Sequence, residues 1–211
     1  MHTDQPRRLK RAHCVHCWKK QCICGFTSAL RSNYPIVILQ HPQEVSKQPG
    51  TARLLSLSLE NGVHRIGLSW PSLRNALGDS PWSAERNWAV LYLGSLKDSD
   101  GISRRGFSLL SGPGRPMDPT SLHGFVLLDG NWQQAKVLWY RNPWLRRLPR
   151  LILPDGPNSY SVLRKAARTA ALSTFGAASQ ALELVGESPT VLEHLSAAFT
   201  RFIEGSENRE D

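Results

Sequence analysis

Four cysteines near the start of the chain have the types and spacing of a metal site. They follow the pattern Cys14-x2-Cys17-x4-Cys22-x-Cys24, and the chain contains no other cysteine. Tetrahedral zinc takes four such thiolates, each at about 2.3 Å from the ion. The x2 spacing of the first pair is typical of a zinc knuckle. Because a shell of four sulfurs leaves no open position, we predict a structural zinc site.

Other interpretations of the cysteine cluster stay open at this point. An iron–sulfur cluster also takes four thiolates, and spacing alone does not exclude it. His13 and His16 lie beside the cysteines and could replace one of them as ligands. Two disulfides are not expected in a reducing compartment, and a redox pair of Cys14 and Cys17 would leave the other two cysteines unexplained.

The composition favours a soluble protein with a polyanionic partner. The 211 residues include 26 Lys and Arg against 17 Asp and Glu, a net charge of +9. Such a basic balance suggests RNA or DNA as the partner. No apolar run approaches the roughly 18 residues of a membrane span. Residues 1–12 are polar and basic without a following hydrophobic stretch, so we expect no secretion signal and a cytoplasmic location.

Short apolar runs predict the strands of one sheet. They cover residues 34–40, 64–68, 88–93, 124–128 and 150–153. Continuous apolar runs separated by helical stretches are typical of a parallel sheet that is covered on both faces. We therefore predict an α/β domain with a mostly parallel sheet flanked by helices.

Helical periodicity accounts for most of the remaining chain. Residues 51–59 have the composition of a helix, and Trp132, Ala135, Lys136 and Trp139 form one helical stripe. Ser173 and Ser188 are expected to cap two further helices, the first of which ends at Gly186. Their apolar faces consist of Phe175, Ala178, Leu182 and Val185 in the first helix and Leu192, Leu195, Phe199 and Phe202 in the second. Residues 95–123 show no strong period.

Three predicted strand ends carry groups that could bind or react with a ligand. In open α/β sheets ligands bind beyond the carboxyl ends of the strands. These ends are Leu93-Gly94-Ser95, Leu128-Asp129-Gly130-Asn131-Trp132 and Leu153-Pro154-Asp155-Gly156. Asp129 is either a catalytic acid or base or simply the cap of the next helix, and Trp132 is either a ligand wall or a core residue. Phosphate-binding glycine loops and the Gly-x-Ser-x-Gly motif of hydrolases do not occur.

Four motifs in a fixed order resemble those of one enzyme family. The cysteine pattern is followed by Gln40-His-Pro-Gln-Glu44, by Leu127-Leu-Asp-Gly-Asn-Trp132-x2-Ala135, and by Tyr160-x3-Arg164-Lys165 with Leu172-Ser-Thr174. Together they resemble the DTW-domain proteins, the tRNA-uridine aminocarboxypropyltransferases, over about residues 13–200.

The resemblance implies a fold related to the SPOUT methyltransferases, with a C-terminal trefoil knot. It also implies S-adenosylmethionine as co-substrate, and transfer of its 3-amino-3-carboxypropyl group to N3 of a tRNA uridine with release of methylthioadenosine. Asp129 matches the motif aspartate that would accept the N3 proton. The other expected site residues are Leu93, Gly94, Ser95, Gly130, Trp132 and Leu153 for the co-substrate, and Arg53, Arg164, Lys165 and Ser173 for substrate groups such as a carboxylate or an RNA phosphate.

The sequence departs from the family pattern at two positions. Asn131 stands where the family usually has Thr, and Gly176 removes a carboxylate that is common in relatives. A SPOUT-type RNA methyltransferase and a non-catalytic zinc-dependent RNA-binding protein therefore remain as alternatives. We expect a zinc module over residues 1–30, a catalytic domain over 31–204 and a charged tail over 205–211, as a monomer or a homodimer.

Overall fold

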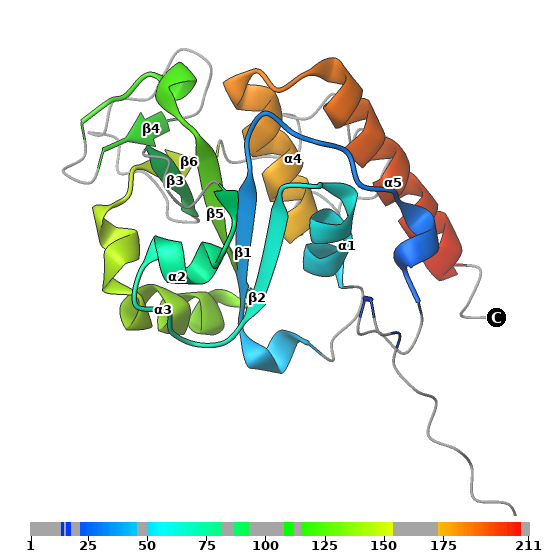
Figure 1. Cartoon of the computed structure of the whole chain (residues 1–211), viewed down its shortest axis with the longest axis horizontal. Coiled ribbons are helices and arrows are strands. Elements are labelled where there is room, and N and C mark those ends of the chain that lie inside the picture. Colours follow the sequence, from blue (N-terminus) through cyan, green and yellow to red (C-terminus); the bar gives the residue numbers. More distant parts are fainter. Residues whose placement is uncertain are drawn as a thin grey trace, which may run out of the picture.

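A six-stranded sheet forms the centre of the molecule, in the order β2-β1-β5-β3-β6-β4 (Figure 1). The computed structural model describes residues 14, 16–17, 22–45, 50–81, 87–92, 108–111, 115–153 and 173–207. All neighbouring strands pair in parallel except β4, which runs antiparallel to β6. The strands are β1 (Ile36–Gln40), β2 (Gly62–Ile66), β3 (Trp88–Tyr92), β4 (Ser108–Leu110), β5 (Gly124–Asp129) and β6 (Arg150–Ile152).

The predicted mostly parallel sheet is confirmed, and its apolar strands explain why. Every residue of β1 is buried, as are the first four residues of β5. Strands with both faces buried need continuous apolar sequence, because each pleat face meets a helix layer. The register of β1 and β5 pairs Ile38 with Leu127 and Gln40 with Asp129. The carboxyl ends of these two strands therefore lie side by side.

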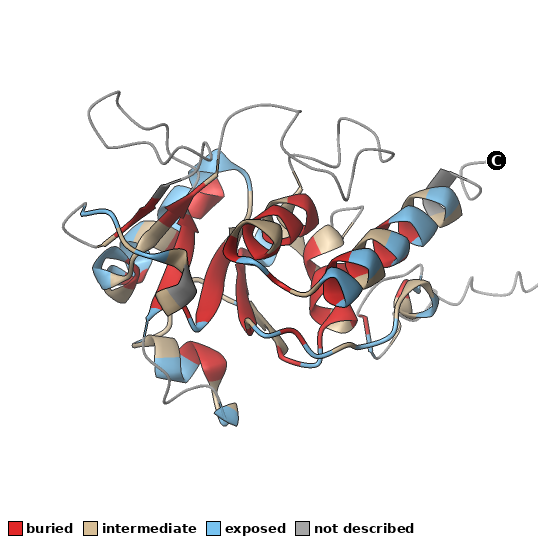
Figure 2. Cartoon of the chain, turned by 90° about the horizontal axis from the view of Figure 1, so that it is seen from above, coloured by how far each residue is buried: buried red, intermediate tan, exposed pale blue. Residues whose placement is uncertain are grey.

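Helices cover both faces of the sheet (Figures 1 and 2). One layer contains α1 (Thr51–Ser58), α4 (Thr174–Val185) and α5 (Pro189–Glu207), whose apolar residues share a core with Ile38, Phe125 and Leu151. The other layer contains α2 (Leu73–Leu77), α3 (Trp132–Arg141) and the 3-10 helix η5 (Pro143–Arg147), packed on Val37, Val90 and Val126. The shorter 3-10 helices are η1 (Cys24–Phe26), η2 (Pro42–Glu44) and η4 (Pro119–Ser121).

The predicted helix starts are confirmed by their caps. Ser173 accepts a hydrogen bond from the Gly176 N–H at 3.1 Å and begins α4, which ends at Gly186. Ser188 accepts one from the Val191 N–H at 3.4 Å at the start of α5. The apolar faces predicted for both helices are buried in one core. Since each cap satisfies an otherwise unpaired backbone donor, these residues fix where the helices begin.

The elements at the sheet edges were the hardest to predict. The edge strand β2 begins at Gly62 rather than at residue 64, and its first four residues are only half-buried. An edge strand has no continuous apolar run to mark its limits. The sequence of the short helix α2 showed no helical period. The segment over residues 95–123, which also showed no period, contains β4 and η4.

Some predictions fall outside the described residues. The trefoil knot predicted for the C-terminal loop region concerns the connection between β6 and α4, residues 154–172, and it stays a prediction. Within the described part of the chain, none of the helices has the length and apolar character needed to cross a bilayer.

Gly124 provides a direct test of the packing at the start of β5. A Cβ at this position would lie 2.7 Å from the Pro35 carbonyl oxygen and 2.9 Å from the Trp88 ring. We expect Gly124→Ala to lower the free energy of unfolding by about 1–3 kcal/mol, the usual cost of overpacking, in urea titrations. Gly25→Ala is the matched control, because a Cβ there would meet no atom within 4 Å. Equal stability of the two variants would contradict this account of the strand.

Candidate active site and metal centre

The Asp129 carboxylate lies where three elements meet at the carboxyl edge of the sheet. Asp129 ends β5, and its carbonyl accepts a hydrogen bond from the His41 N–H at 2.9 Å, directly after β1. The Gln40 Nε2 donates to Asp129 Oδ2 at 2.6 Å, and the Thr174 hydroxyl of α4 donates to Oδ1. Each carboxylate oxygen can accept a further hydrogen bond. The carboxylate is therefore fixed in orientation while keeping the capacity to accept a proton.

Asn131, and not Asp129, caps the N-terminus of α3. The Asn131 side chain accepts from the Gln134 N–H at 3.0 Å, and the Gln134 Oε1 accepts from the Asn131 N–H at 2.7 Å. This reciprocal capping box satisfies the helix start without the preceding aspartate. The interpretation of Asp129 as a simple helix cap is wrong, and Asn131 keeps the helix-start role expected of it despite its departure from the family pattern.

The turn between β5 and α3 requires glycine and joins the Gln40–Glu44 motif to the site. A Cβ on Gly130 would lie 2.8 Å from the Gln134 Cβ, so a side chain there would push α3 away. Gln134 in turn donates through Nε2 to Gln43 Oε1 at 3.3 Å. The motif that follows β1 thus contacts both the carboxylate, through Gln40, and the start of α3, through Gln43.

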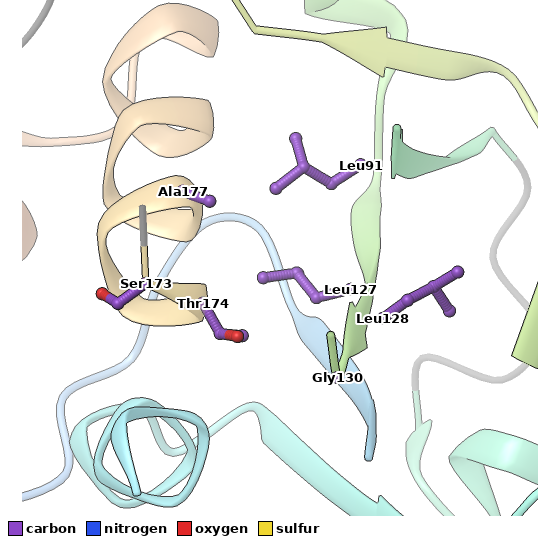
Figure 3. Close-up of a pocket in the computed structure, with 7 residues that line it drawn as sticks. All are labelled: Leu91, Leu127, Leu128, Gly130, Ser173, Thr174 and Ala177. Carbon is purple, nitrogen blue, oxygen red and sulfur yellow. The ribbon is translucent and has the colours of Figure 1, made fainter. Parts of the chain in front are cut away.

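A hollow opens between the sheet and α4 (Figure 3), and one of its lining residues, Thr174, donates a hydrogen bond to Asp129. Leu91 and Leu127 extend from the sheet toward α4, and Thr174 and Ala177 face them from the helix. The hollow has a volume of about 410 Å³, including the space open to solvent. Such concave sites, with apolar walls and a few polar groups, are typical of small-molecule binding. Its lining residues are Leu91, Leu127, Leu128, Gly130, Ser173, Thr174 and Ala177.

A second hollow, which we call the α3 groove, lies between α3 and residues of β3 and β5. Leu91 and Leu128 border both hollows, so the two are neighbours. Trp132 is 55% exposed, and its place as a core residue is thereby excluded. The predicted helical stripe of α3 lines this groove, while Ala135 is buried and Trp139 also packs against the core. The α3 groove is lined by Leu91, Leu128, Trp132, Ala135, Lys136, Trp139 and Tyr140.

The structure brings only some of the predicted site residues together. Gly130 and Ser173 line the first hollow, and Asp129 adjoins it through its hydrogen bond with Thr174. Trp132 lies in the α3 groove, and Leu153 packs half-buried against the core. Leu93, Gly94, Ser95, Arg164 and Lys165 lie outside the described residues. Arg53 lies elsewhere, on α1 beside the cysteine cluster.

Gln40 and Thr174 are site residues that sequence reasoning missed. Both contact the Asp129 carboxylate, although neither residue type is by itself a sign of catalysis. The only sequence feature that pointed to Gln40 and Thr174 was that each lies within one of the ordered motifs. Their contacts with Asp129 depend on strand register and on the position of α4, which the motifs alone do not provide.

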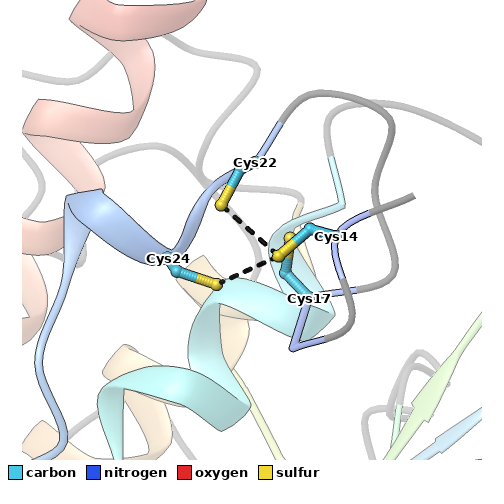
Figure 4. Close-up of side chains that lie close together, drawn as sticks. All are labelled: Cys14, Cys17, Cys22 and Cys24. Atoms are coloured by element: carbon cyan, nitrogen blue, oxygen red, sulfur yellow. Dashed lines mark hydrogen bonds between the residues drawn. The ribbon is translucent and has the colours of Figure 1, made fainter. Parts of the chain in front are cut away.

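The four cysteine side chains converge at one point beside α1 (Figure 4). The Cys14 sulfur lies 3.5 Å from that of Cys22 and 3.9 Å from that of Cys24, and all four sulfurs lie within 4.8 Å of one another. Tetrahedral zinc with bonds of about 2.3 Å separates its sulfurs by about 3.8 Å. None of the four cysteines forms a disulfide, so the alternative of two disulfides is not realised. The donor set and its spacing therefore fit a tetrahedral metal ion.

The environments of the cysteines differ before any metal binds. Backbone N–H groups of Cys17 and His16 lower the pKa of Cys14 to about 6, because they stabilise a thiolate. Burial raises the pKa of Cys24 to about 12. Burial also lowers the pKa of Arg53, whereas negative charge on Cys17 and its neighbours acts in the opposite direction. Arg53 Nη2 donates to the His16 carbonyl and so holds the cysteine loop to α1.

The cysteine segment packs directly on the main core. Cys17 and Ile23 are 1% and 3% exposed and belong to the same cluster as Phe199 and Phe202. The Phe26 ring meets Phe202 edge-on, with centroids 5.8 Å apart, and its carbonyl accepts from Arg201 Nε at 2.9 Å. A metal ion bound by the cysteines would thus stabilise the contact between η1, α1 and α5.

Comparison with known proteins identifies the class that this fold and site define. The DTW domain matches residues 11–206, so the chain belongs to the DTW-domain family. It is similar to three proteins named tRNA-uridine aminocarboxypropyltransferase 2. The Drosophila melanogaster protein is 30% identical over 92% of this chain and 73% of its own length. The Macaca fascicularis and Mus musculus proteins are 27% and 28% identical over 88% of this chain, which spans 60% of their length. No solved structure gives a significant match.

Metal analysis tests the cysteine site. We expect the purified chain to contain about one zinc ion, and Cys22→Ser to lose most of it, because three thiolates hold the ion less tightly than four. Chelation should lower the free energy of unfolding, since η1 and α1 lose their common anchor. Ser28→Ala, an exposed substitution just outside the cluster, is the control. Iron with visible absorbance in place of zinc would overturn the choice of metal, and full zinc content in Cys22→Ser would overturn the ligand set.

Proposed function

We propose that this protein is a tRNA-uridine aminocarboxypropyltransferase that uses S-adenosylmethionine as co-substrate. The observation that carries the proposal is the Asp129 carboxylate, held by Gln40 and Thr174 beside two neighbouring hollows. Family membership and the names of the three relatives support it. An enzyme of this kind must bind two molecules at once, and two adjoining hollows beside one fixed base suit that task.

Asp129 acts in this proposal as the general base. Uridine N3 carries a weakly acidic proton, which Asp129 accepts as N3 attacks the γ-carbon of the aminocarboxypropyl group. The N3–carbon bond forms as the carbon–sulfur bond breaks, and the sulfur keeps the electron pair in the methylthioadenosine that leaves. The sulfonium supplies the electrophile and a neutral leaving group. Gln40 and Thr174 orient the carboxylate, which matters because proton transfer requires hydrogen-bond distance.

The hollow beside α4 is the proposed co-substrate site. Gly130 and Ser173 line it, and Leu153 directly follows β6. Together with Leu93, Gly94 and Ser95 they would hold the adenosine, at the carboxyl ends of β3, β5 and β6 where open sheets bind ligands. Trp132 lines the neighbouring α3 groove. It would wall the methionine arm where that arm reaches past Leu128 toward the groove, and turn its γ-carbon toward the uridine.

The basic residues predicted to bind substrate are proposed for different contacts. Arg164 and Lys165 stay proposed for the co-substrate carboxylate or an RNA phosphate. Arg53 already donates to His16 in the cysteine loop. It fits a phosphate contact next to the zinc module better than a contact with the co-substrate. We assign residues 1–30 to that module, residues 31–204 to a SPOUT-like domain with a knotted C-terminal region, and residues 205–211 to a charged tail whose first three residues form the end of α5.

Product analysis tests the proposal and separates it from its alternatives. Incubation with S-adenosylmethionine and unmodified tRNA should release methylthioadenosine and give 3-(3-amino-3-carboxypropyl)uridine by mass spectrometry. Release of S-adenosylhomocysteine with a methylated nucleoside would instead show a methyltransferase. RNA binding with neither product and no affinity for the co-substrate would show a binding protein.

Replacement of the base should separate binding from chemistry. We expect Asp129→Asn to bind S-adenosylmethionine normally in calorimetry and to lose about 100- to 10,000-fold in turnover, the contribution of a positioned base. Asp79→Asn, at an exposed aspartate after α2, is the matched control and should keep full activity. Undiminished turnover in Asp129→Asn would remove the base assignment.

The hydroxyl of Thr174 gives a finer test of how the carboxylate is held. We expect Thr174→Val, which keeps the shape and removes the donor, to lower kcat about tenfold, the equivalent of a hydrogen bond to a charged group. Thr174→Ser keeps the donor to Asp129 Oδ1 and should retain most activity. Equal rates in the two variants would mean that the hydroxyl does not orient the carboxylate.

A further inference from the structure

The α3 groove lies outside every role assigned so far except that of Trp132, and its chemistry is distinctive. Trp132, Trp139 and Tyr140 line it together with Lys136. Tyr140 is 68% exposed, and Trp132 is 55% exposed. Large aromatic side chains are costly to leave exposed on a surface that binds nothing, which marks such a patch as a binding site.

We propose that the α3 groove binds single-stranded RNA next to the target uridine, with nucleobases stacked on Trp139 and Tyr140, beyond the part of the groove that Trp132 reserves for the co-substrate. This inference rests on the proposed function for its choice of RNA. Sequence-tolerant recognition of single strands combines aromatic platforms for bases with cations for phosphates. The groove supplies both, and it borders the hollow beside Asp129 through Leu91 and Leu128.

The charge of this region favours RNA over a protein partner. Residues 130–150 contain no Asp or Glu. They carry five cationic residues, Lys136, Arg141, Arg146, Arg147 and Arg150. The first four of these are exposed. Of these, Lys136 lines the groove and Arg150 lies over the Trp139 ring. Positive charge at and near an aromatic groove complements a polyanion, and every phosphate contact releases counterions from the nucleic acid.

Cations are interleaved with the aromatic rings at stacking distance. Lys136 Nζ lies 5.1 Å from the Trp132 ring centroid, and the Arg150 guanidinium carbon lies 5.9 Å from the Trp139 centroid. Cation–π pairs of this kind hold the rings in place, and Lys136 remains exposed. Tyr140, one turn beyond Lys136 on the same helix, extends the platform away from Asp129.

Binding of an unmodified tRNA transcript to Tyr140 variants tests the groove. We expect Tyr140→Ala to raise the dissociation constant about five- to a hundredfold, the usual loss of affinity for one stacked base. Tyr140→Phe keeps the ring and should bind like the unchanged protein. Val137→Ala is the control, because Val137 is exposed on the same helix but does not line the groove. The KM for S-adenosylmethionine should stay unchanged in all three variants.

The salt dependence of tRNA binding tests the electrostatic part. We expect Lys136→Gln to reduce the slope of log K against log salt by about 1, the loss of one phosphate contact. Tyr140→Ala should leave the slope unchanged, because stacking releases no counterions. Arg31→Gln is the charge control, since Arg31 is exposed in the segment that precedes β1.

The outcomes separate this inference from the proposed function. Unweakened tRNA binding in Tyr140→Ala, or equal weakening in Val137→Ala, would overturn the groove even if the unchanged protein forms the modified uridine. Loss of binding in Tyr140→Phe as well would overturn the stacking role. Conversely, selective weakening in Tyr140→Ala without any product from the unchanged protein would support the groove and contradict the proposed reaction.

Discussion

The hydrogen bonds that Asp129 accepts from Gln40 and Thr174 are the constraint on which the rest of the site depends. They join β1, β5 and α4 through one carboxylate, and a hydrogen bond to a charged group contributes about 1.5–3 kcal/mol. The contacts form only if β1 and β5 keep the register that pairs Gln40 with Asp129. Packing at Gly124 and the cap at Ser173 therefore influence the position of the Asp129 carboxylate indirectly, through β5 and α4.

The two hollows on either side of Leu91 and Leu128 suggest how the protein handles two substrates of unlike chemistry. The hollow beside α4 has leucine walls with two hydroxyl side chains, whereas the α3 groove is aromatic and cationic. A small co-substrate and a splayed nucleotide would then approach Asp129 from different sides. The cysteine cluster adds a third feature, because Arg53 connects it to the same helix layer that carries Thr174.

The sequence predicted those parts of the fold where burial is complete. The strands β1, β3, β5 and β6 and the caps of α4 and α5 follow from apolar runs and from single polar residues at helix starts. The edge strand β2 was predicted two residues too far along the chain, because its half-buried residues mark no clear limit. The other edge strand, β4, lies in the segment without a period and was not predicted. Asp129 was predicted from the end of its strand, but its partners Gln40 and Thr174 lie 89 and 45 residues away in the chain. Only the packed structure brings them together, and it likewise places Arg53 at the cysteine loop.

The central claim is that a positioned Asp129 transfers the aminocarboxypropyl group to uridine in tRNA. It is tested most directly by mass spectrometry of tRNA nucleosides from cells that lack this gene and any second family member. We predict that the unchanged gene restores 3-(3-amino-3-carboxypropyl)uridine and that Asp129→Asn, expressed at the same level, does not. Full restoration by Asp129→Asn, or an unchanged nucleoside profile with the intact gene, would contradict the account.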